Sequence, residues 1–125
     1  MEPGEELLLQ VPIAHKLRNP LEMTPTRRTA YLTDSRLIIE KEGDYLYIPF
    51  EWMVGLNLVG LHNTEKAIKL EHGRKIRFSV HTKEALHERN RKTEKLYNWL
   101  HDLCNRPDKA SSVIKEIKAA RKFFQ

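Results

Sequence analysis

The most informative stretch of this chain is TAYLTDSRLIIEK, residues 29–41. Ala30 and Leu32 alternate with more polar neighbours before the turn, and an apolar run, residues 37–39, follows it. Alternation and short apolar runs bounded by turn residues indicate strands. Asp34 and Ser35 suit the turn, because their short side chains can hydrogen-bond to nearby backbone groups. Residues 28–41 are therefore predicted to form a hairpin.

Further strands are predicted on both sides of this hairpin. Residues 6–14 form a first strand, in which Pro12 requires an edge or bulge because it has no N–H to donate. A loop spans residues 15–27, and Gly43 supplies a turn that permits positive φ. Strands at 45–48 and 54–61 flank a bend at 50–53. The clearest hairpin is 67–80, which turns at His72-Gly73. Its apolar face carries Ile68, Leu70, Ile76, Phe78 and Val80, and its basic face carries Lys69, Lys75 and Arg77.

Two helices are predicted after the seventh strand. Thr82 is the expected N-cap of the first, and its apolar stripe is Leu96, Trp99, Leu100 and Leu103. These positions fall at i, i+3, i+4 and i+7, which is one face of a helix. Residues 106–108 end it, and a second helix starts at about residue 112, with the stripe Val113, Ile117, Ala120 and Phe124. Seven short strands and an amphipathic helix fit a small bent barrel or sandwich, with Trp99 closing the core.

This order of elements resembles the pleckstrin-homology-like superfold, on its GRAM and GLUE side, with the GLUE domain of the endosomal-sorting ESCRT machinery as the closest named relative. The likeness is carried by residues 5–9, 30–39 and 47–50, the hairpin around Gly73, and the closing helix with Trp99. A Leu-Thr-x-x-Arg-Leu-Ile-like motif stands at residues 32–38, and Phe50 replaces the Leu of an Ile-Pro-Leu-like step. The likeness spans residues 5–104.

The resemblance implies a mainly β domain: a seven-stranded bent antiparallel barrel or sandwich, capped by one α-helix, with a short extra C-terminal helix. It assigns residues 1–106 to the domain and 107–125 to a basic amphipathic helix or linker. Domains of this superfold are non-catalytic adaptors that bind phosphoinositide head groups, peptides, ubiquitin or other proteins. Some belong to endosomal-sorting or transcription-repair assemblies, and the superfold alone does not choose among these ligands.

Composition sets broad bounds on the partners. The 125 residues carry a net charge of +5, a mild bias toward anionic partners. The single cysteine, Cys104, cannot form an internal disulfide, which fits a reducing compartment. The acidic start lacks the basic segment of a signal peptide, and no apolar run approaches the ~20 residues of a membrane span. The expected location is cytoplasmic, with membrane contact only at the periphery.

The candidate ligand-binding residues are basic. Lys16, Arg18, Arg27 and Arg28, beside His15, flank the loop between the first two strands. Lysine and arginine can hold phosphate oxygens through charge-assisted hydrogen bonds, so this loop is a candidate site for a phosphoinositide or an acidic partner. A solvated loop with scattered charges is the competing interpretation, since Pro20, Glu22 and Pro25 interrupt the basic residues. Recognition of ubiquitin or an acidic peptide is the alternative function.

The C-terminal helix has two open interpretations. Lys115, Lys118, Arg121 and Lys122, with Phe124, could contact an anionic membrane, where each basic side chain adds ~1 kcal/mol. The same helix could instead pack on this domain or on a partner helix, and the pattern favours packing against protein over membrane contact.

Other classes of site receive little support. The six histidines show no metal-ligand spacing, so no metal or other cofactor is predicted. The chain lacks a Gly-rich phosphate loop, G-x-S-x-G and H-E-x-x-H, which argues against an enzyme. Arg74, Lys75 and Arg77 make a basic strand edge, but without aromatic stacking partners on that face nucleic acid is disfavoured.

Overall fold

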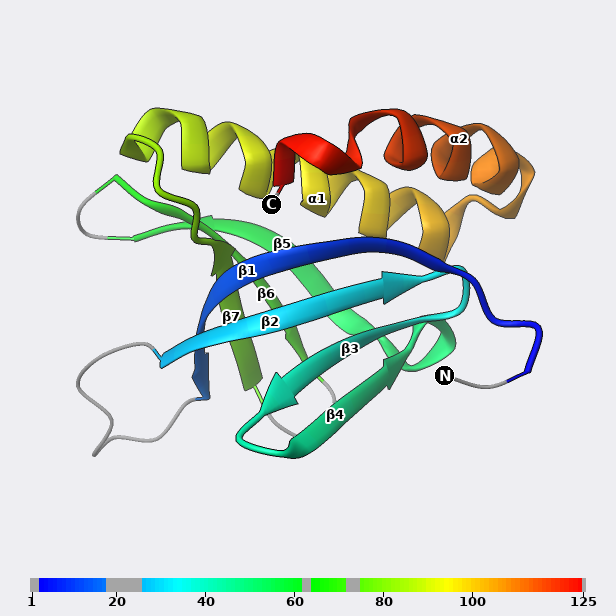
Figure 1. The fold of residues 1–125 in the computed structure, drawn as a ribbon, viewed down its shortest axis with the longest axis horizontal. Coiled ribbons are helices and arrows are strands. Elements are labelled where there is room, and N and C mark those ends of the chain that lie inside the picture. The colour runs from blue at the N-terminus through cyan, green and yellow to red at the C-terminus, as the bar shows by residue number, and fades with distance from the viewer. Residues whose placement is uncertain (1–2, 18–25, 62–63, 72–74, 125) are drawn as a thin grey trace.

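The computed structural model describes residues 3–17, 26–61, 64–71 and 75–124 (Figure 1). Seven strands precede the helices: β1 (Leu7–Leu17), β2 (Thr26–Thr33), β3 (Arg36–Lys41), β4 (Asp44–Pro49), β5 (Val54–Gly60), β6 (Lys66–Glu71) and β7 (Lys75–Val80). The α-helices are α1 (Leu86–Asn105) and α2 (Ala110–Ala120). Short 3-10 turns are η1 (Phe50–Trp52), η2 (Pro107–Lys109) and η3 (Arg121–Phe124). This arrangement confirms the predicted fold class of antiparallel strands followed by C-terminal helices.

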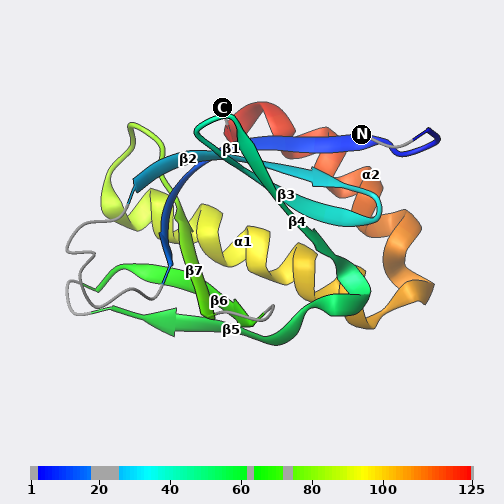
Figure 2. The same cartoon turned by 90° about the horizontal axis from the view of Figure 1, so that it is seen from below.

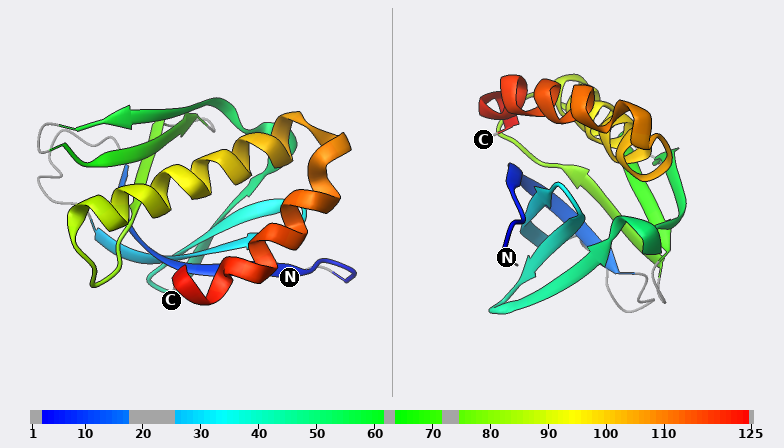
Figure 3. Two further views of the ribbon diagram at one scale, coloured as in Figure 1. Left: turned by 90° about the horizontal axis from the view of Figure 1, so that it is seen from above. Right: turned by 90° about the vertical axis from the view of Figure 1, so that its right-hand side faces the viewer.

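The strands form one antiparallel sheet in the order β4-β3-β2-β1-β7-β6-β5. The sheet bends at β1, which pairs with β2 on one side and with β7 on the other. Figure 3 shows the two halves facing each other, with the helices along one end of the space between them. No pairing joins β4 to β5 among the described residues. A bent sandwich, not a closed barrel, is therefore the form adopted.

Two local features of the strands follow from backbone chemistry. Pro12 pairs with Thr29 of β2, whereas the pairing of β1 with β7 starts one residue later, at Ile13. Pro12 is thus locally at an edge, as its missing N–H requires. Glu42 and Gly43 form the two-residue turn between β3 and β4 with φ of 46° and 88°, a turn whose positive φ values match the twist of the strands. The predicted turn at His72-Gly73 lies outside the described residues.

The core lies between the two halves of the sheet and the helices. Apolar side chains alternate inward along the strands, and the predicted inward set of the β6–β7 hairpin is buried throughout. Figure 2 shows α1 lying lengthwise between the β1–β4 half and the β5–β7 half. The principal buried side chains are Leu8, Val11, Ile13, Leu32, Leu37, Ile39, Ile48, Ile68, Leu70, Phe78, Leu96, Trp99 and Leu100.

The helices start at residues other than those predicted. Thr82 does not cap α1: its hydroxyl donates to Glu84 at 2.9 Å, and Ala85 is the N-cap residue without a side-chain hydrogen bond. The buried Thr93 instead ties the helix to the sheet, because its hydroxyl accepts the Val80 N–H at 3.0 Å and donates to the Arg89 carbonyl at 2.9 Å. Among the described residues, no helix combines the length and apolar character needed to cross a bilayer.

The Thr-x-x-Arg motif at the β2–β3 turn is a structural network. The Thr33 hydroxyl donates to Glu5 Oε2 at 2.6 Å and accepts the N–H groups of Ser35 and Arg36. Arg36 donates from Nε to Glu5 Oε2 at 2.9 Å and from NH2 to Oε1 at 3.0 Å. The Ser35 hydroxyl donates to the same carboxylate at 2.9 Å. The motif therefore binds the Glu5 carboxylate and so holds the segment before β1 against the β2–β3 hairpin.

Candidate anion-binding site

A basic hollow lies where β2 begins and β7 runs into α1. Its volume is about 740 Å³, and its lining is Pro12, Ile13, Arg27, Arg28, His81, Thr82, Lys83, Glu84 and Lys92. We call it the basic pocket. The pairing of β1 positions the two sides, because Ile13 pairs with Arg28 of β2 and with Val80 of β7. The His81 N–H also donates to the Pro12 carbonyl at 2.9 Å. Residues far apart in the sequence thereby share one cavity.

Positive charge dominates the lining of the basic pocket. Among the described residues, its one acidic lining residue is Glu84, which forms an ion pair with Lys92 and accepts a hydrogen bond from Thr82. The hydrogen bonds from Lys92 and then Thr82 lower the pKa of the Glu84 carboxyl, so it is ionised at neutral pH. Glu84 and Lys92 therefore offset each other. Arg27, Arg28 and Lys83 supply the remaining charge of the lining.

Arg28 is the lining residue of the basic pocket that has a buried donor atom without a hydrogen-bond partner among the described residues. It is only 10% exposed, and its single ion-pair contact among the described residues is NH1 to Glu42 Oε1 at 4.0 Å. Its Nε–H has no hydrogen-bond partner in the described part of the chain. A buried donor without an acceptor lowers stability, and a charged donor forms its strongest hydrogen bonds with an anion. The pocket therefore offers an unpartnered charged donor, the Arg28 Nε–H, to an anionic group.

His81 lies against a second arginine at the α1 side of the pocket. Arg89 NH1 is 3.1 Å from His81 Nδ1, and because a guanidinium can only donate, Nδ1 is the acceptor and the imidazole is neutral. Burial lowers the pKa of His81, as do the charges of Arg27 and Arg89, whereas Glu65 opposes them. Like Arg28, Arg89 has an Nε–H without a hydrogen-bond partner in the ranges that the structure describes.

The residues predicted from sequence fall in different places. Arg27 and Arg28 both line the basic pocket. Lys16 lies in β1, paired with Arg77 of β7, and Arg18 is outside the described residues. Sequence reasoning missed the pocket residues His81, Lys83 and Lys92, which join the site only through the pairing of β1 with β7. The available signal was the cluster of basic residues directly after the last strand.

The C-terminal segment packs on this domain. Phe124 is 2% exposed, and its ring centroid is 5.3 Å from that of Trp99. Of the two interpretations of this helix, the burial of Phe124 fits packing on this domain, and its neighbour Phe123 is the exposed one, at 59%. Lys115, Lys118, Arg121 and Lys122 are exposed, and Lys118 forms an ion pair with Glu6. Lys92 of the basic pocket donates to the Phe123 carbonyl, so η3 ends close to the pocket.

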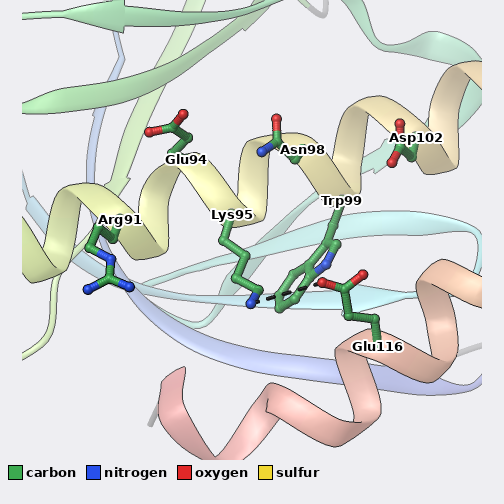
Figure 4. Close-up of a pocket in the computed structure, with 7 residues that line it drawn as sticks. All are labelled: Arg91, Glu94, Lys95, Asn98, Trp99, Asp102 and Glu116. Carbon is green, nitrogen blue, oxygen red and sulfur yellow. Dashed lines mark ion pairs between the residues drawn. The ribbon is translucent and has the colours of Figure 1, made fainter.

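A second hollow, of about 390 Å³, lies between α1 and α2. Figure 4 shows Lys95 of α1 and Glu116 of α2 pointing toward each other beside Trp99, with Nζ and Oε1 4.0 Å apart. The rest of its lining is Arg91, Glu94, Asn98 and Asp102. Acidic and basic side chains are mixed here, so the hollow has no strong preference for either sign of charge.

The cysteine thiol and the possible metal ligands are the remaining groups that could carry reactive chemistry. Burial raises the pKa of Cys104 to about 11, and its Sγ lies 3.5 Å from Met53 Sδ, which keeps the thiol protonated and unreactive at neutral pH. Within the described ranges, no three His, Cys, Asp or Glu side chains are grouped as metal ligands would be.

Comparison with solved structures finds 35 similar chains. No protein-family model matches the sequence, and no curated protein matches it. A solved structure described as "Vps36 N-terminal PH domain" is similar, with 13% sequence identity and a TM-score of 0.49 over 78% of this chain and 83% of that one. At that identity and score the likeness says nothing about a ligand, and the functional argument depends on the basic pocket.

Proposed function

We propose that this chain is a non-catalytic binding module that recruits its host to anionic phospholipid membranes by holding a phosphorylated head group in the basic pocket. The observation that carries the proposal is Arg28: a guanidinium 10% exposed, with an unpartnered Nε–H among the described residues, in a cavity lined mainly by positive charge. A phosphate group offers several acceptor oxygens and charge in a compact shape, which suits clustered arginine and lysine donors.

The dimensions of the basic pocket also support a head group. Its volume of about 740 Å³ lies within the usual range for small-molecule sites, roughly 300–1,000 Å³. The alternative, recognition of ubiquitin or an acidic peptide, would bring carboxylates to the same charges. We favour the head group because Arg28 is recessed, so its ligand must project a compact anionic group into the cavity. A phosphoinositide, whose ring carries phosphates that project in this way, is the proposed lipid.

The exposed basic residues near the C-terminus are proposed as a secondary contact. Lys115, Arg121 and Lys122 face solvent, and each would add ~1 kcal/mol of attraction near an anionic surface. Phe123 is exposed beside them and its carbonyl meets Lys92 at the pocket. These side chains would strengthen binding to any anionic membrane, whereas the basic pocket would select the head group.

Charge reversal in the basic pocket tests the proposal. The double variant Arg27→Glu/Arg28→Glu is expected to bind phosphoinositide-containing vesicles at least roughly tenfold more weakly, because removing a charge-assisted hydrogen bond costs about 1.5–3 kcal/mol. The measurement is flotation with phosphatidylcholine vesicles that carry a phosphoinositide, or phosphatidylserine at the same total charge.

The matched control is Arg106→Glu/Lys109→Glu, which makes the same charge change at exposed positions beyond the far end of α1. An equal loss in both double variants would mean that only net charge matters and would contradict a specific pocket. Full binding by the pocket variant would also refute the proposal, and preferential capture of an acidic peptide would favour the alternative function.

Anion binding in the pocket is expected to tighten as the pH falls. The pKa of His81 in the free protein is lowered from 6.5, first by burial and then by Arg27 and Arg89. A bound anion stabilises the imidazolium, so the pKa of His81 rises on binding, and a proton is taken up between the pKa of the free protein, which lies below 6.5, and the higher pKa of the complex. Sulfate is the appropriate probe because its own charge is constant over this range. Its affinity, followed by NMR titration, should rise from pH 8 to 5 in the native chain and stay nearly flat in His81→Gln. Equal pH dependence in both would show that His81 is not coupled to the site.

A further inference from the structure

Two exposed tyrosine side chains, Tyr45 and Tyr47, lie side by side on β4. Five large apolar side chains are well exposed among the described residues, and four of them lie within residues 45–54: Tyr45, Tyr47, Trp52 and Val54. The fifth is Phe123, near the basic pocket. Clustered exposed aromatic side chains mark interaction surfaces more often than scattered ones do. We call the outer side of β2, β3 and β4 around Tyr45 and Tyr47 the tyrosine face.

Strand pairing holds the tyrosine face in a fixed arrangement. Tyr31 pairs with Ile38, and Ile38 with Tyr47, so these three side chains form one row across the outer side of the sheet. The Tyr45 and Tyr47 rings are 6.1 Å apart, and the Arg36 guanidinium lies over the Tyr47 ring at 4.6 Å. The Tyr31 hydroxyl donates to Glu40 at 2.9 Å. A face that is already ordered loses little conformational entropy when a partner binds.

The same strand is an open edge of the sheet. β4 is at the end of the strand order, so one side of its backbone has no strand partner in the described part of the chain. Natural proteins commonly protect such edges with lysine or proline. Residues 44–48 contain neither, and Pro49 stands only at the end of the strand. An unprotected edge beside a tyrosine face can accept an extended peptide as an additional strand.

The charge of the residues around β4 indicates which kind of partner can bind this surface. Residues 40–51 carry four acidic side chains against one basic, and Arg28 pairs with Glu42 at 4.0 Å, which leaves this region with a net charge of −2, although the whole chain is +5. An anionic membrane would be repelled. A second copy pairing through the same edge would bring its own acidic residues to the same interface, because a two-fold interface joins identical surfaces. A partner segment that carries lysine or arginine is attracted instead.

We propose that β4 and the tyrosine face bind an extended basic peptide by strand addition. Backbone groups of β4 would pair with the peptide, and its apolar side chains would lie on Tyr45 and Tyr47. Side chains of an added strand alternate between its two faces, so its lysine or arginine side chains would lie on the face opposite the tyrosines, on the side of Asp44. This surface is separate from the basic pocket and has the opposite charge, so the module would hold a lipid and a basic protein segment at the same time.

The experiment uses the full chain and a synthetic peptide of about six residues, the usual strand length, in which valine alternates with lysine. Binding is measured by calorimetry, and exchange of the β4 backbone amides is followed with and without peptide. Affinity should fall at least roughly tenfold in Tyr45→Ser/Tyr47→Ser, because buried aromatic side chains carry most of the binding energy of an interface. The β4 amides should exchange more slowly in the native complex.

Calorimetry is carried out without lipid, so peptide binding is measured whether or not the chain binds vesicles, which separates failure of the proposed membrane function from failure of this inference. Arg106→Glu/Lys109→Glu, at exposed positions beyond α1, should bind this peptide as the native chain does. A peptide with glutamate in place of lysine should not bind. Equal binding of the two peptides would overturn the charge argument, and binding without slower exchange in β4 would overturn strand addition. Dimers of the free chain that dissociate in Tyr45→Ser/Tyr47→Ser would identify a second copy as the occupant and refute the proposal.

Discussion

Phe124→Ala is expected to lower the free energy of unfolding by about 3–4 kcal/mol, the usual effect of truncating a buried phenylalanine. Phe124 is 2% exposed and contacts Trp99 at a centroid distance of 5.3 Å. Val113 and Ile117 bury the same side of α2 against the core. Removal of the Phe124 ring would leave a cavity beside Trp99 and free η3 from β1. Urea unfolding followed by circular dichroism measures the change.

The neighbouring residue provides a matched control. Phe123 has the same side chain but is 59% exposed, so Phe123→Ala should change the free energy of unfolding by about 0.5 kcal/mol or less. In a Trp52→Phe background the emission reports Trp99 alone, and it should shift to the red in Phe124→Ala but not in Phe123→Ala. Equal effects of the two alanine substitutions would contradict the burial of Phe124. The expected result would extend the folded unit past residue 106, the boundary predicted from sequence.

Glu5→Ala is expected to lower the free energy of unfolding by about 3 kcal/mol, because breaking a buried ion pair leaves an uncompensated charge. The Glu5 and Arg36 side chains are 4% and 16% exposed, with Arg36 Nε 2.9 Å from Glu5 Oε2. Thr33 and Ser35 also donate to this carboxylate. Arg36→Lys should be destabilised as well, since an ammonium cannot reproduce the two parallel hydrogen bonds of a guanidinium.

The exposed pair between Lys66 and Glu94 is the control for this experiment. Its Nζ and Oε2 atoms are also 2.9 Å apart, but both side chains are almost half exposed. Glu94→Ala should therefore cost under about 1 kcal/mol, as exposed ion pairs do. Glu5→Ala/Arg36→Ala should be less destabilised than the sum of the single variants, because no unpaired charge remains. Strict additivity in this cycle would show that the two side chains do not interact.

This network also explains why the sequence motif predicted the fold better than it predicted a ligand. Thr33 and Arg36 belong to the motif on which the family resemblance depends, and their hydrogen-bonding groups are engaged by Glu5. Their conformational role is local to one hairpin and the segment before it. The motif is therefore informative about the sheet and carries no information about what the domain binds.

Strand and helix positions were predictable because they depend on local periodicity. The alternation of Ile76, Phe78 and Val80, and the helical spacing of Leu96, Trp99 and Leu100, placed these side chains in the core, where all six are buried. The start of α1 was less predictable. Thr82 is a good N-cap residue by type, but its hydroxyl bonds to Glu84 and the helix begins at Leu86.

The basic pocket required the tertiary structure. Arg27 and Arg28 could be named as candidates from their charge, but their distance from Lys83 and Lys92 depends on the pairing of β1 with both β2 and β7. The difference between Phe123 and Phe124 has the same origin, since neighbouring phenylalanines have identical chemistry and only packing on Trp99 buries one of them. Local residue patterns specify which elements form, whereas contacts between distant elements specify which charges are left without partners and so available to a ligand.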